Sequence, residues 1–395
     1  MKNKNIFSRK PLFDKCLKSF SKKINYKIRK SSFLVIGGAG TIGQATTREI
    51  FIRNPKKLHV IDISENNLVE LVRDLRSSAG YITGDFKTFV IDCGSELFKT
   101  FFKSQGPYDY VLNLSALKHV RSERDIYSSI RMISTNVLNT EKIIKLSIKS
   151  KVKNLFSVST DKASNPINLM GCSKLLMENM LQLNSKKLRY SSARFANVAF
   201  SDGSLLYGFQ QRFEKKQPLA APKDINRYFI TKKESGILCL LSCLLGNSGE
   251  VFFPNAPDKL KPINLEKIAI KFLKDRGYDP YFCKTENEAR KKFNSLFKKK
   301  KWPCFFFDSI STGEKELEIF FSDSEKIKKS KFKEIGIVKS NKNLKKTKLL
   351  KLFKFLKEKK VSNGKISKAK IVNFFKKNIE NFEHKELYKN LDEKM

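Results

Sequence analysis

Three observations predict an α/β protein with a doubly wound parallel sheet. From Phe33 onward, short runs of β-branched and aromatic residues alternate with segments of helical period. A glycine-rich turn follows the first of these runs and opens a helical segment. After about residue 200 the alternation loosens, and Gly, Pro and Asp interrupt shorter apolar runs. Strands that alternate with helices form βαβ units, so the first part of the chain should be a parallel sheet covered on both faces.

The expected strands are short and apolar, as in a sheet that is buried on both faces. In chain order they are 33–36, 58–62, 88–92, 110–114, 154–159 and 188–192. The clearest helical pattern lies between the second and third strands, at 66–78, where Leu68, Leu71 and Leu75 recur at helical spacing. An asparagine at the start of this segment can cap the helix.

Composition divides the chain into four expected parts. Residues 1–30 form a basic lead-in without clear periodicity. Residues 31–200 are expected to be the dinucleotide-binding domain and to contain the catalytic segment. Residues 201–325 are expected to form a smaller α/β substrate-binding region that returns in part to the core. Residues 326–395 are rich in lysine and are expected to form a mainly helical extension.

The chain is strongly basic, with a net charge of +41 from 80 Lys and Arg against 39 Asp and Glu. Such a charge is typical of nucleic-acid-binding proteins. The lysines are spread along nearly the whole chain, however, and accompany abundant Asn, Ile and Phe, as a genome rich in A and T would produce. We therefore do not expect a nucleic-acid partner, although a surface of this charge favours anionic ligands.

The cysteines and the apolar runs bear on the location of the protein. Seven cysteines occur without a CxxC pair, which predicts a reduced compartment with neither a metal site nor a disulfide framework. Cys239 and Cys243 lie in an apolar helical segment and are expected to be core thiols. No apolar run approaches the roughly 20 residues that span a bilayer, and the first thirty residues do not resemble a signal peptide. A cytoplasmic protein is expected.

The glycine-rich turn has the spacing of a dinucleotide-binding loop, which makes the predicted fold Rossmann-like. Gly37 permits a tight turn, Gly40 lets backbone N–H groups approach a pyrophosphate, and Gly43 lets the helix pack against the strand. Thr41 and Ile42 begin that helix, whose N-terminus attracts the anion.

Two carboxylates at the ends of the next strands complete this predicted site. Asp62 lies 19 positions after Gly43. It can accept hydrogen bonds from the adenosine ribose hydroxyls and would repel a 2′-phosphate. Asp92 ends the third expected strand, where it can meet the adenine. NAD is therefore the expected cofactor, and NADP is less favoured. The nearby cations at 56, 57 and 73, which could bind a 2′-phosphate, are the argument for NADP.

A strand end, a polar loop and a helix start bring reactive groups together in the middle of the chain. The loop carries Thr160, Asp161 and Lys162, and the helix begins near Met170. Lys174 lies about one turn after Met170, so both side chains project from the same helix face. The segment thus offers a hydroxyl, a carboxylate and two amines within a small region.

These motifs resemble a known family. The GxxGxxG spacing resembles the extended short-chain dehydrogenase/reductases. Within that group, the sequences at 114–120, 135–137, 159–166 and 170–174 resemble the polysaccharide-biosynthesis (CapD-like) UDP-N-acetylglucosamine 4,6-dehydratases. The resemblance runs from about residue 31 to at least residue 250, and we expect it to continue to Met395. Met170 stands where some members of the family have tyrosine. A methionine at this position resembles one branch of the family, whose members often carry membrane-spanning N-terminal extensions. This chain resembles a soluble short form of it.

The resemblance implies a reaction and a role for each residue. Oxidation at C4 of the sugar makes H5 acidic, loss of H5 and of the C6 hydroxyl expels water, and return of the hydride to C6 regenerates NAD. Lys162 would be the C5 base, Asp161 the acid at O6, and Thr160 a hydrogen-bonding partner near O4. Lys174 would hold the nicotinamide ribose, and Asn136 would support the site from the neighbouring helix.

Met170 raises the question of which group takes the C4 hydroxyl proton, because a thioether cannot accept one. Our hypothesis is that Asp161 or an ordered water takes it, in which case Asp161 serves twice. Ordinary packing on the helix face is the alternative explanation for Met170.

The predicted substrate-binding residues come from several motifs. Lys118 belongs to the segment at 114–120, and Arg194 and Asn197 match an Arg-x-x-Asn-Val element of the family. Ser204 ends a loop that resembles Ser-Arg-Gly-Ser, except that Asp202 replaces the arginine and puts phosphate binding by that position in doubt. Arg227 is the candidate for bidentate contacts with the diphosphate.

Two other functions stay open at this point. A nucleotide-sugar epimerase could use the same fold and the same ketone intermediate. A non-catalytic dinucleotide- or nucleic-acid-binding protein is a more distant alternative, against which the complete Thr-Asp-Lys set argues. The resemblance implies a homo-oligomer. The sequence leaves open a UDP or a GDP sugar, the configuration at C5, the glycan pathway and the role of the C-terminal extension.

Overall fold

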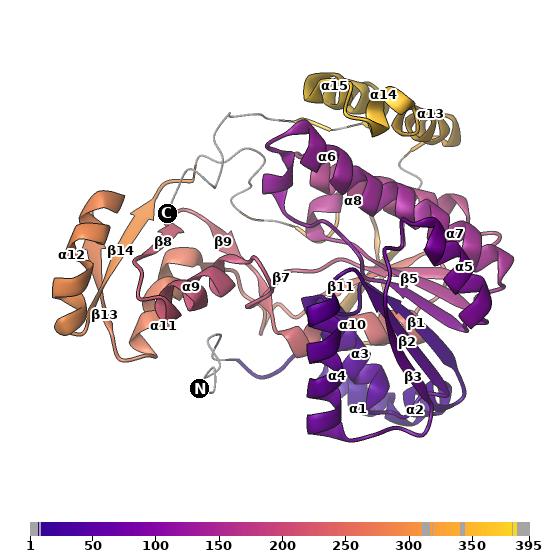
Figure 1. Ribbon diagram of the computed structural model, residues 1–395, viewed down its shortest axis with the longest axis horizontal. Coiled ribbons are helices and arrows are strands. Elements are labelled where there is room, and N and C mark those ends of the chain that lie inside the picture. Colours follow the sequence, from indigo (N-terminus) through magenta and orange to yellow (C-terminus); the bar gives the residue numbers. More distant parts are fainter. Residues whose placement is uncertain are drawn as a thin grey trace.

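A nine-stranded sheet forms the centre of the protein in a computed structural model that describes residues 7, 9–309, 317, 319–339, 344–380 and 382–384. The strand order is β15-β16-β11-β6-β5-β4-β1-β2-β3 (Figure 1). All neighbours from β3 to β11 are parallel, and β16 and β15 continue the sheet antiparallel. The strands are β1 (Ser32–Ile36), β2 (Lys57–Asp62), β3 (Asp85–Val90), β4 (Tyr110–Asn113), β5 (Asn154–Val158), β6 (Tyr190–Ala193), β11 (Glu250–Pro254), β15 (Ile327–Lys328) and β16 (Ile335–Lys339). The order β3-β2-β1-β4-β5-β6 is that of a Rossmann-like fold, which confirms the predicted fold class.

Helices cover both faces of the sheet (Figure 1). Successive side chains of β1 point to opposite faces of the sheet: Phe33 and Val35 belong to one core cluster, and Leu34 and Ile36 belong to the other. The first layer holds α1 (Asp14–Ser19), α2 (Ser21–Arg29), α3 (Thr41–Phe51), α4 (Glu65–Ala79) and α10 (Lys232–Leu245). The second layer holds α5 (Glu96–Gln105), α6 (Ile126–Ile133), α7 (Asn139–Lys149) and α8 (Leu169–Leu183).

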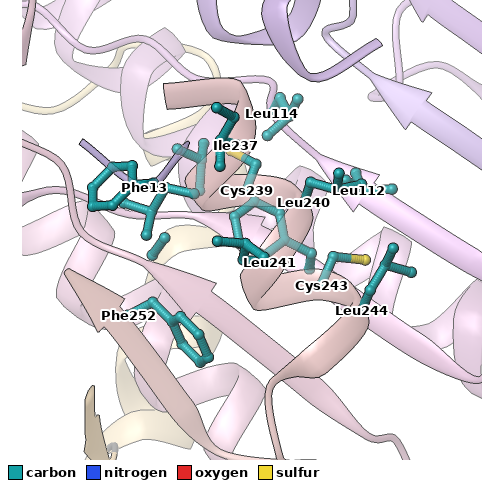
Figure 2. Packing of buried hydrophobic residues seen from close by; sticks show 14 of the residues in the cluster. Phe13, Leu112, Leu114, Ile237, Cys239, Leu240, Leu241, Cys243, Leu244 and Phe252 are labelled. Carbon is teal, nitrogen blue, oxygen red and sulfur yellow. The ribbon is translucent and has the colours of Figure 1, made fainter. Parts of the chain in front are cut away.

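Helix α10 is buried in the first layer, where it packs against the sheet and against α3. Figure 2 shows its side chains, among them Leu240 and Leu241, packed with Leu112 of β4, Phe252 of β11 and Phe13 of the N-terminal segment. Cys239 and Cys243 of α10 are buried free thiols, as the sequence predicted. Their burial raises the pKa of both thiols.

A smaller α/β region stands beside the main sheet and has its own core around Trp302, which is fully buried. Its three-stranded sheet has the order β13-β14-β8. The elements of this region are α9 (Leu205–Glu214), β8 (Leu219–Pro222), α11 (Leu265–Lys274), β13 (Asp279–Cys283), α12 (Glu286–Lys298) and β14 (Lys301–Phe307). Four two-residue strands pair between the two regions, namely β7 (Asn197–Val198) with β10 (Phe229–Ile230), and β9 (Asn226–Arg227) with β12 (Ile263–Asn264).

The expectation of a lead-in without periodicity at 1–30 was wrong for the described residues of that part. Helices α1 and α2 lie there, and Leu12, Phe13, Ile24 and Ile28 are fully buried in the core of the first layer. Ile24 and Ile28 are spaced four apart, which is one helical turn, and the surrounding lysines concealed this pattern.

The expected C-terminal extension is helical only in part. Residues 327–339 contribute β15 and β16 to the main sheet, because Ile335 and Ile337 alternate on a strand that pairs with β11. The helices α13 (Lys346–Leu356), α14 (Lys359–Ser362) and α15 (Lys368–Asn378) follow and join the core of the second layer. Among the helices that the structure describes, none has both the length and the hydropathy required to cross a bilayer.

Candidate active site

The glycine-rich turn joins β1 to α3 at the carboxyl edge of the sheet. Gly37 has a φ of +72°, and a Cβ there would lie 2.6 Å from the backbone nitrogen of Ser115. A Cβ on Gly43 would lie 2.2 Å from the carbonyl oxygen of Gly37, so α3 can approach the turn only without a side chain. At Gly40, by contrast, the nearest atom to a Cβ is 3.7 Å away. The backbone is thus bare at the start of α3, as close approach of a pyrophosphate requires.

Of the two predicted cofactor carboxylates, Asp62 is the last residue of β2, and Asp92 lies in the loop just after β3. Oδ2 of Asp62 accepts a hydrogen bond from the backbone of Ala39 at 3.0 Å, which places this carboxylate beside the glycine-rich turn. Asp92 accepts one from the backbone of Gly94 at 2.7 Å and forms an ion pair with Arg131 at 3.2 Å. The bare glycine backbone and the adjacent Asp62 carboxylate fit an adenine dinucleotide with a free 2′-hydroxyl.

A loop from the second half of the chain closes on the start of α3. The hydroxyl of Thr41 donates to Oδ2 of Asp202 at 2.9 Å and accepts from the backbone of Asp202 at 3.1 Å. Ile42 follows and is partly buried against the core. Ser204, a predicted substrate residue, caps α9 by accepting from the backbone of Tyr207 at 3.3 Å. This loop therefore lies next to the predicted pyrophosphate position.

The catalytic loop is held between the end of β5 and the first turn of α8. Thr160 caps a 3-10 turn at Asp161–Ala163, and Asn168 caps α8 by accepting from the backbone of Gly171 at 2.7 Å. A Cβ on Gly171 would lie 2.5 Å from the carbonyl oxygen of Lys162. Because only glycine allows this contact, the first turn of α8 is pressed directly against the loop that carries the reactive residues.

One carboxylate oxygen collects the polar groups of the catalytic loop. Oδ1 of Asp161 accepts from the hydroxyl of Thr160 at 2.8 Å, from the backbone of Lys162 at 2.9 Å and from Nζ of Lys162 at 3.2 Å. The side chain of Asp161 is 5% exposed and that of Lys162 is 18% exposed. The three residues predicted to act on the sugar therefore form one hydrogen-bonded group, in which the side chain of Lys162 is partly exposed to solvent.

Lys174 and Met170 are buried on α8 behind this group. Nζ of Lys174 donates to the carbonyl oxygen of Val158, the last residue of β5, at 3.1 Å. Burial lowers the pKa of Lys174 to about 8, although the carboxylate of Glu178 opposes the shift. Met170 is 2% exposed, and its backbone N–H donates to Glu123 at 2.8 Å. No signal in the sequence distinguished Glu123 from the charged residues around it.

Asn136 ties the loop after β4 to the catalytic helix. It lies in the π-helical turn Ser134–Leu138 between α6 and α7, a feature that is frequent at functional sites. Its side chain hydrogen-bonds both backbone groups of Leu117, at 3.1 and 2.9 Å, and the hydroxyl of Ser173 at 2.9 Å. These bonds fix the backbone of Leu117 and thereby position the following residue, Lys118. Its pKa is lowered because its surroundings desolvate the ammonium, an effect that the nearby Asp202 carboxylate opposes.

Asn197 and Arg227 lie on short strands between the main sheet and the smaller region, β7 and β9 (Figure 1). The side chain of Asn197 donates to the carbonyl oxygen of Tyr228 at 3.4 Å. Arg227 is 6% exposed and donates to the backbone of Asn226 at 2.9 Å. These placements put both predicted substrate residues where the two regions meet.

Arg194, a predicted substrate residue, lies in a buried ion-pair network. The residue is 1% exposed, and its guanidinium bridges two buried carboxylates, Glu178 at 2.7 and 3.0 Å and Glu325 at 2.6 and 2.8 Å. Burial alone would lower the pKa of Arg194, but the two carboxylates outweigh it and raise the pKa. Arg194 therefore links β6, α8 and the segment 319–325 beneath the catalytic loop. The sequence showed its family motif but not these distant partners.

The sequence matches the family described as "Polysaccharide biosynthesis protein" over residues 33–340. An uncharacterized membrane protein of Methanocaldococcus jannaschii is 30% identical over 64% of this chain and 74% of its own length. The capsular polysaccharide biosynthesis protein CapD of Staphylococcus aureus is 29% identical over 63% of this chain, and the match spans only 42% of CapD.

Relatives with two different activities match about equally well. A UDP-N-acetylglucosamine 4,6-dehydratase (inverting) of Campylobacter jejuni is 26% identical over 59% of this chain and 69% of its own length. A UDP-glucose 4-epimerase of Rickettsia rickettsii is also 26% identical, over 57% of this chain and 66% of its own length.

Solved structures confirm the fold. Pen from Bacillus thuringiensis superposes with a TM-score of 0.65 at 22% identity, covering 79% of this chain and 88% of Pen. DesIV, a dTDP-glucose 4,6-dehydratase from Streptomyces venezuelae solved with NAD and TYD bound, gives a TM-score of 0.56 at 16% identity over 73% of this chain and 87% of DesIV.

The buried link at Arg194 gives a first testable prediction. In Arg194→Met, Glu178 and Glu325 lose their shared cation, and breaking a buried ion pair in this way costs about 3–5 kcal/mol. We expect urea denaturation to show a decrease of about that size in the free energy of unfolding. The control Arg48→Met removes a surface pair with Asp74, which is worth about 0–1 kcal/mol. Unchanged stability with a raised KM for the substrate would instead restore Arg194 as a substrate residue.

Proposed function

Because the chain belongs to the polysaccharide biosynthesis protein family, a CapD-like group of extended short-chain dehydrogenase/reductases, we propose that it is a nucleotide-sugar 4,6-dehydratase. Its substrate would be UDP-N-acetylglucosamine and its product a UDP-4-keto-6-deoxy-N-acetylhexosamine used in surface polysaccharide or glycan biosynthesis. The single observation that carries the proposal is the hydrogen-bonded group of Thr160, Asp161 and Lys162. Elimination across C5 and C6 needs a base and an acid side by side, and this group supplies both.

The cofactor of the proposed reaction is NAD. The glycine-rich turn would hold its pyrophosphate, Asp62 its adenosine ribose and Lys174 its nicotinamide ribose. When bound, NAD supplies a reversible oxidation of the sugar at C4 and the matching reduction at C6, so no net oxidation occurs. The remaining task, moving protons at O4, C5 and O6, falls to the side chains of this chain.

Asp161 and Lys162 would carry out the elimination. Lys162, as a neutral amine, removes the proton at C5 while Asp161 gives a proton to O6, so the C5–H and C6–O bonds break and water leaves. Lys162 then returns its proton to C5 as C6 is reduced. Nζ of Lys162 and Oδ1 of Asp161 lie 3.2 Å apart, so the two groups can act on adjacent atoms of one sugar.

Thr160 connects the C4 hydroxyl to the same carboxylate. Its hydroxyl donates to Oδ1 of Asp161 at 2.8 Å, so a proton leaving O4 can pass through Thr160 to Asp161. Asp161 would deliver that proton to O6 in the next step. These three side chains account for every proton that the reaction transfers, if Asp161 is ionised and Lys162 is neutral when the substrate binds. No ionisable group is then required at Met170.

An epimerase is the second candidate, because a 26% identical relative is a UDP-glucose 4-epimerase. An epimerase uses the ketone at C4 but needs no acid at O6. The mass of the product separates the two functions: dehydration removes one water, whereas epimerisation leaves the mass unchanged.

The central prediction of the proposed function concerns Asp161. Incubation of the full chain with UDP-N-acetylglucosamine and NAD is expected to give a product lighter by one water, detected by mass spectrometry and identified by NMR. Asp161→Asn cannot give the proton to O6 and is expected to lower kcat by about 10²- to 10⁴-fold. The matched control, Asp74→Asn, changes a carboxylate that is 61% exposed and should keep full activity. Full turnover by Asp161→Asn would refute the assignment, and a product of unchanged mass would favour the epimerase.

The buried Lys174 predicts a pH dependence of NAD binding. A pKa lowered to about 8 means that the ammonium is charged below pH 8 and loses its charge as the pH rises through that value. If only the charged form holds the ribose, the Kd for NAD should rise about tenfold between pH 7 and pH 9. Isothermal titration calorimetry on wild type and Lys174→Met checks this. The variant should bind weakly without this pH dependence, and an identical pH profile in both proteins would contradict the assignment.

A further inference from the structure

The C-terminal helices lie outside the part of the chain that matches the family, which ends at residue 340. They pack over the second helical layer, near α6 and α8 (Figure 1). Leu349, Leu352 and Phe353 of α13 belong to the same buried cluster as Leu175 and Leu176 of α8. This addition to the family domain therefore shares a core with the helix that carries Met170 and Lys174.

A charged contact fastens the same helices to α7. Nζ of Lys357, just after α13, lies 2.6 Å from a carboxylate oxygen of Glu141 in α7. Burial tends to raise the pKa of Glu141, but hydrogen bonds from Lys357 and Lys145 lower it overall. The C-terminal helices are thus attached to the family domain by an apolar core and by this ion pair.

Beyond α15 the chain turns inward and ends its described part at the catalytic helix. Phe382 is 4% exposed, and the side chain of His384 is 2% exposed. Nε2 of His384 lies 3.2 Å from Oε2 of Glu123, and Oε1 of the same carboxylate accepts from the backbone of Met170 at 2.8 Å. His384, Glu123 and Met170 therefore form a continuous hydrogen-bonded chain from the C-terminal segment to the first turn of α8.

Glu123 depends on both contacts because it is buried. A carboxylate taken out of water is costly unless each oxygen finds a donor, and its side chain is only 4% exposed. The N-terminus of α8 satisfies one oxygen and favours the negative charge. His384 satisfies the other. Without the imidazole, Oε2 of Glu123 would lose its donor and the carboxylate would have to shift towards water, which would disturb its bond to Met170.

A disturbance at Met170 would reach the proposed C5 base. The next residue, Gly171, packs so tightly that a Cβ would lie 2.5 Å from the carbonyl oxygen of Lys162. A shift in the first turn of α8 therefore moves the backbone of the catalytic loop.

We propose that His384 is a positioning residue, carried by the C-terminal extension to Glu123, where it fixes the first turn of α8 against the catalytic loop. The C-terminal extension thus completes the support of the site from outside the family domain. The kinetic consequence rests on the proposed dehydratase function. The structural consequence, protection of the Met170 amide, does not depend on which reaction the protein catalyses.

Hydrogen–deuterium exchange and kinetics on His384 variants test this proposal. In His384→Ala, peptides covering residues 169–174 should exchange faster, and kcat should fall by roughly 10- to 100-fold with little change in KM, as expected for a small misplacement of a reactive group. His384→Gln, whose amide N–H can still donate to Glu123, should restore both the slow exchange and most of kcat. The control Lys377→Gln alters an exposed residue of α15 and should change neither quantity.

The outcomes divide cleanly. Unchanged exchange at 169–174 in His384→Ala overturns the proposal, and so does failure of His384→Gln to restore it. If His384→Ala does not fold, His384→Gln decides alone: wild-type exchange and turnover support positioning through the Glu123 contact, and loss of either overturns it. If the wild-type protein turns over no nucleotide sugar, the proposed function fails while the exchange data still decide the role of His384.

Discussion

The hydrogen bonds that converge on Oδ1 of Asp161 are the interaction on which the proposed chemistry depends. They bring a hydroxyl, a backbone amide and a side-chain amine to one buried oxygen, so the proposed acid and base are oriented before a sugar arrives. Such preorganisation removes the need to rearrange the loop during the reaction. In the proposed reaction these three residues, Thr160, Asp161 and Lys162, would move every proton, so a methionine could stand at position 170.

The loop keeps this arrangement because several buried polar contacts enclose it. Arg194 joins α8 to the segment 319–325 below the loop, and Asn136 joins α8 to the loop after β4. Glu123 holds the first turn of α8 from behind. Each contact links elements that are far apart in the sequence, and each leaves a buried polar group without a partner when it is broken. The site is therefore an outcome of tertiary packing as much as of its own motif.

The sequence predicted the parts of the site that depend on local pattern. The glycine spacing, Asp62 and the loop at Thr160–Lys162 lie next to strands whose apolar runs were recognisable, and these strands occur close to their expected positions. Arg194, Glu123 and His384 could not be assigned in this way. Arg194 finds its partners 16 and 131 positions away, and His384 finds Glu123 261 positions away. Lysine-rich surroundings hid the apolar spacing of α1 and α2, because a charged exposed face obscures a narrow buried stripe.

The fate of the hydrogen at C4 tests the central claim most directly. UDP-N-acetylglucosamine labelled with deuterium at C4 would be incubated with the full chain and NAD, and the product would be examined by NMR. The proposed cycle moves that hydrogen within one sugar, so the deuterium should appear at C6 of a 4-keto-6-deoxy product. Deuterium retained at C4 of a product that keeps its C6 hydroxyl would contradict the dehydratase and identify an epimerase instead.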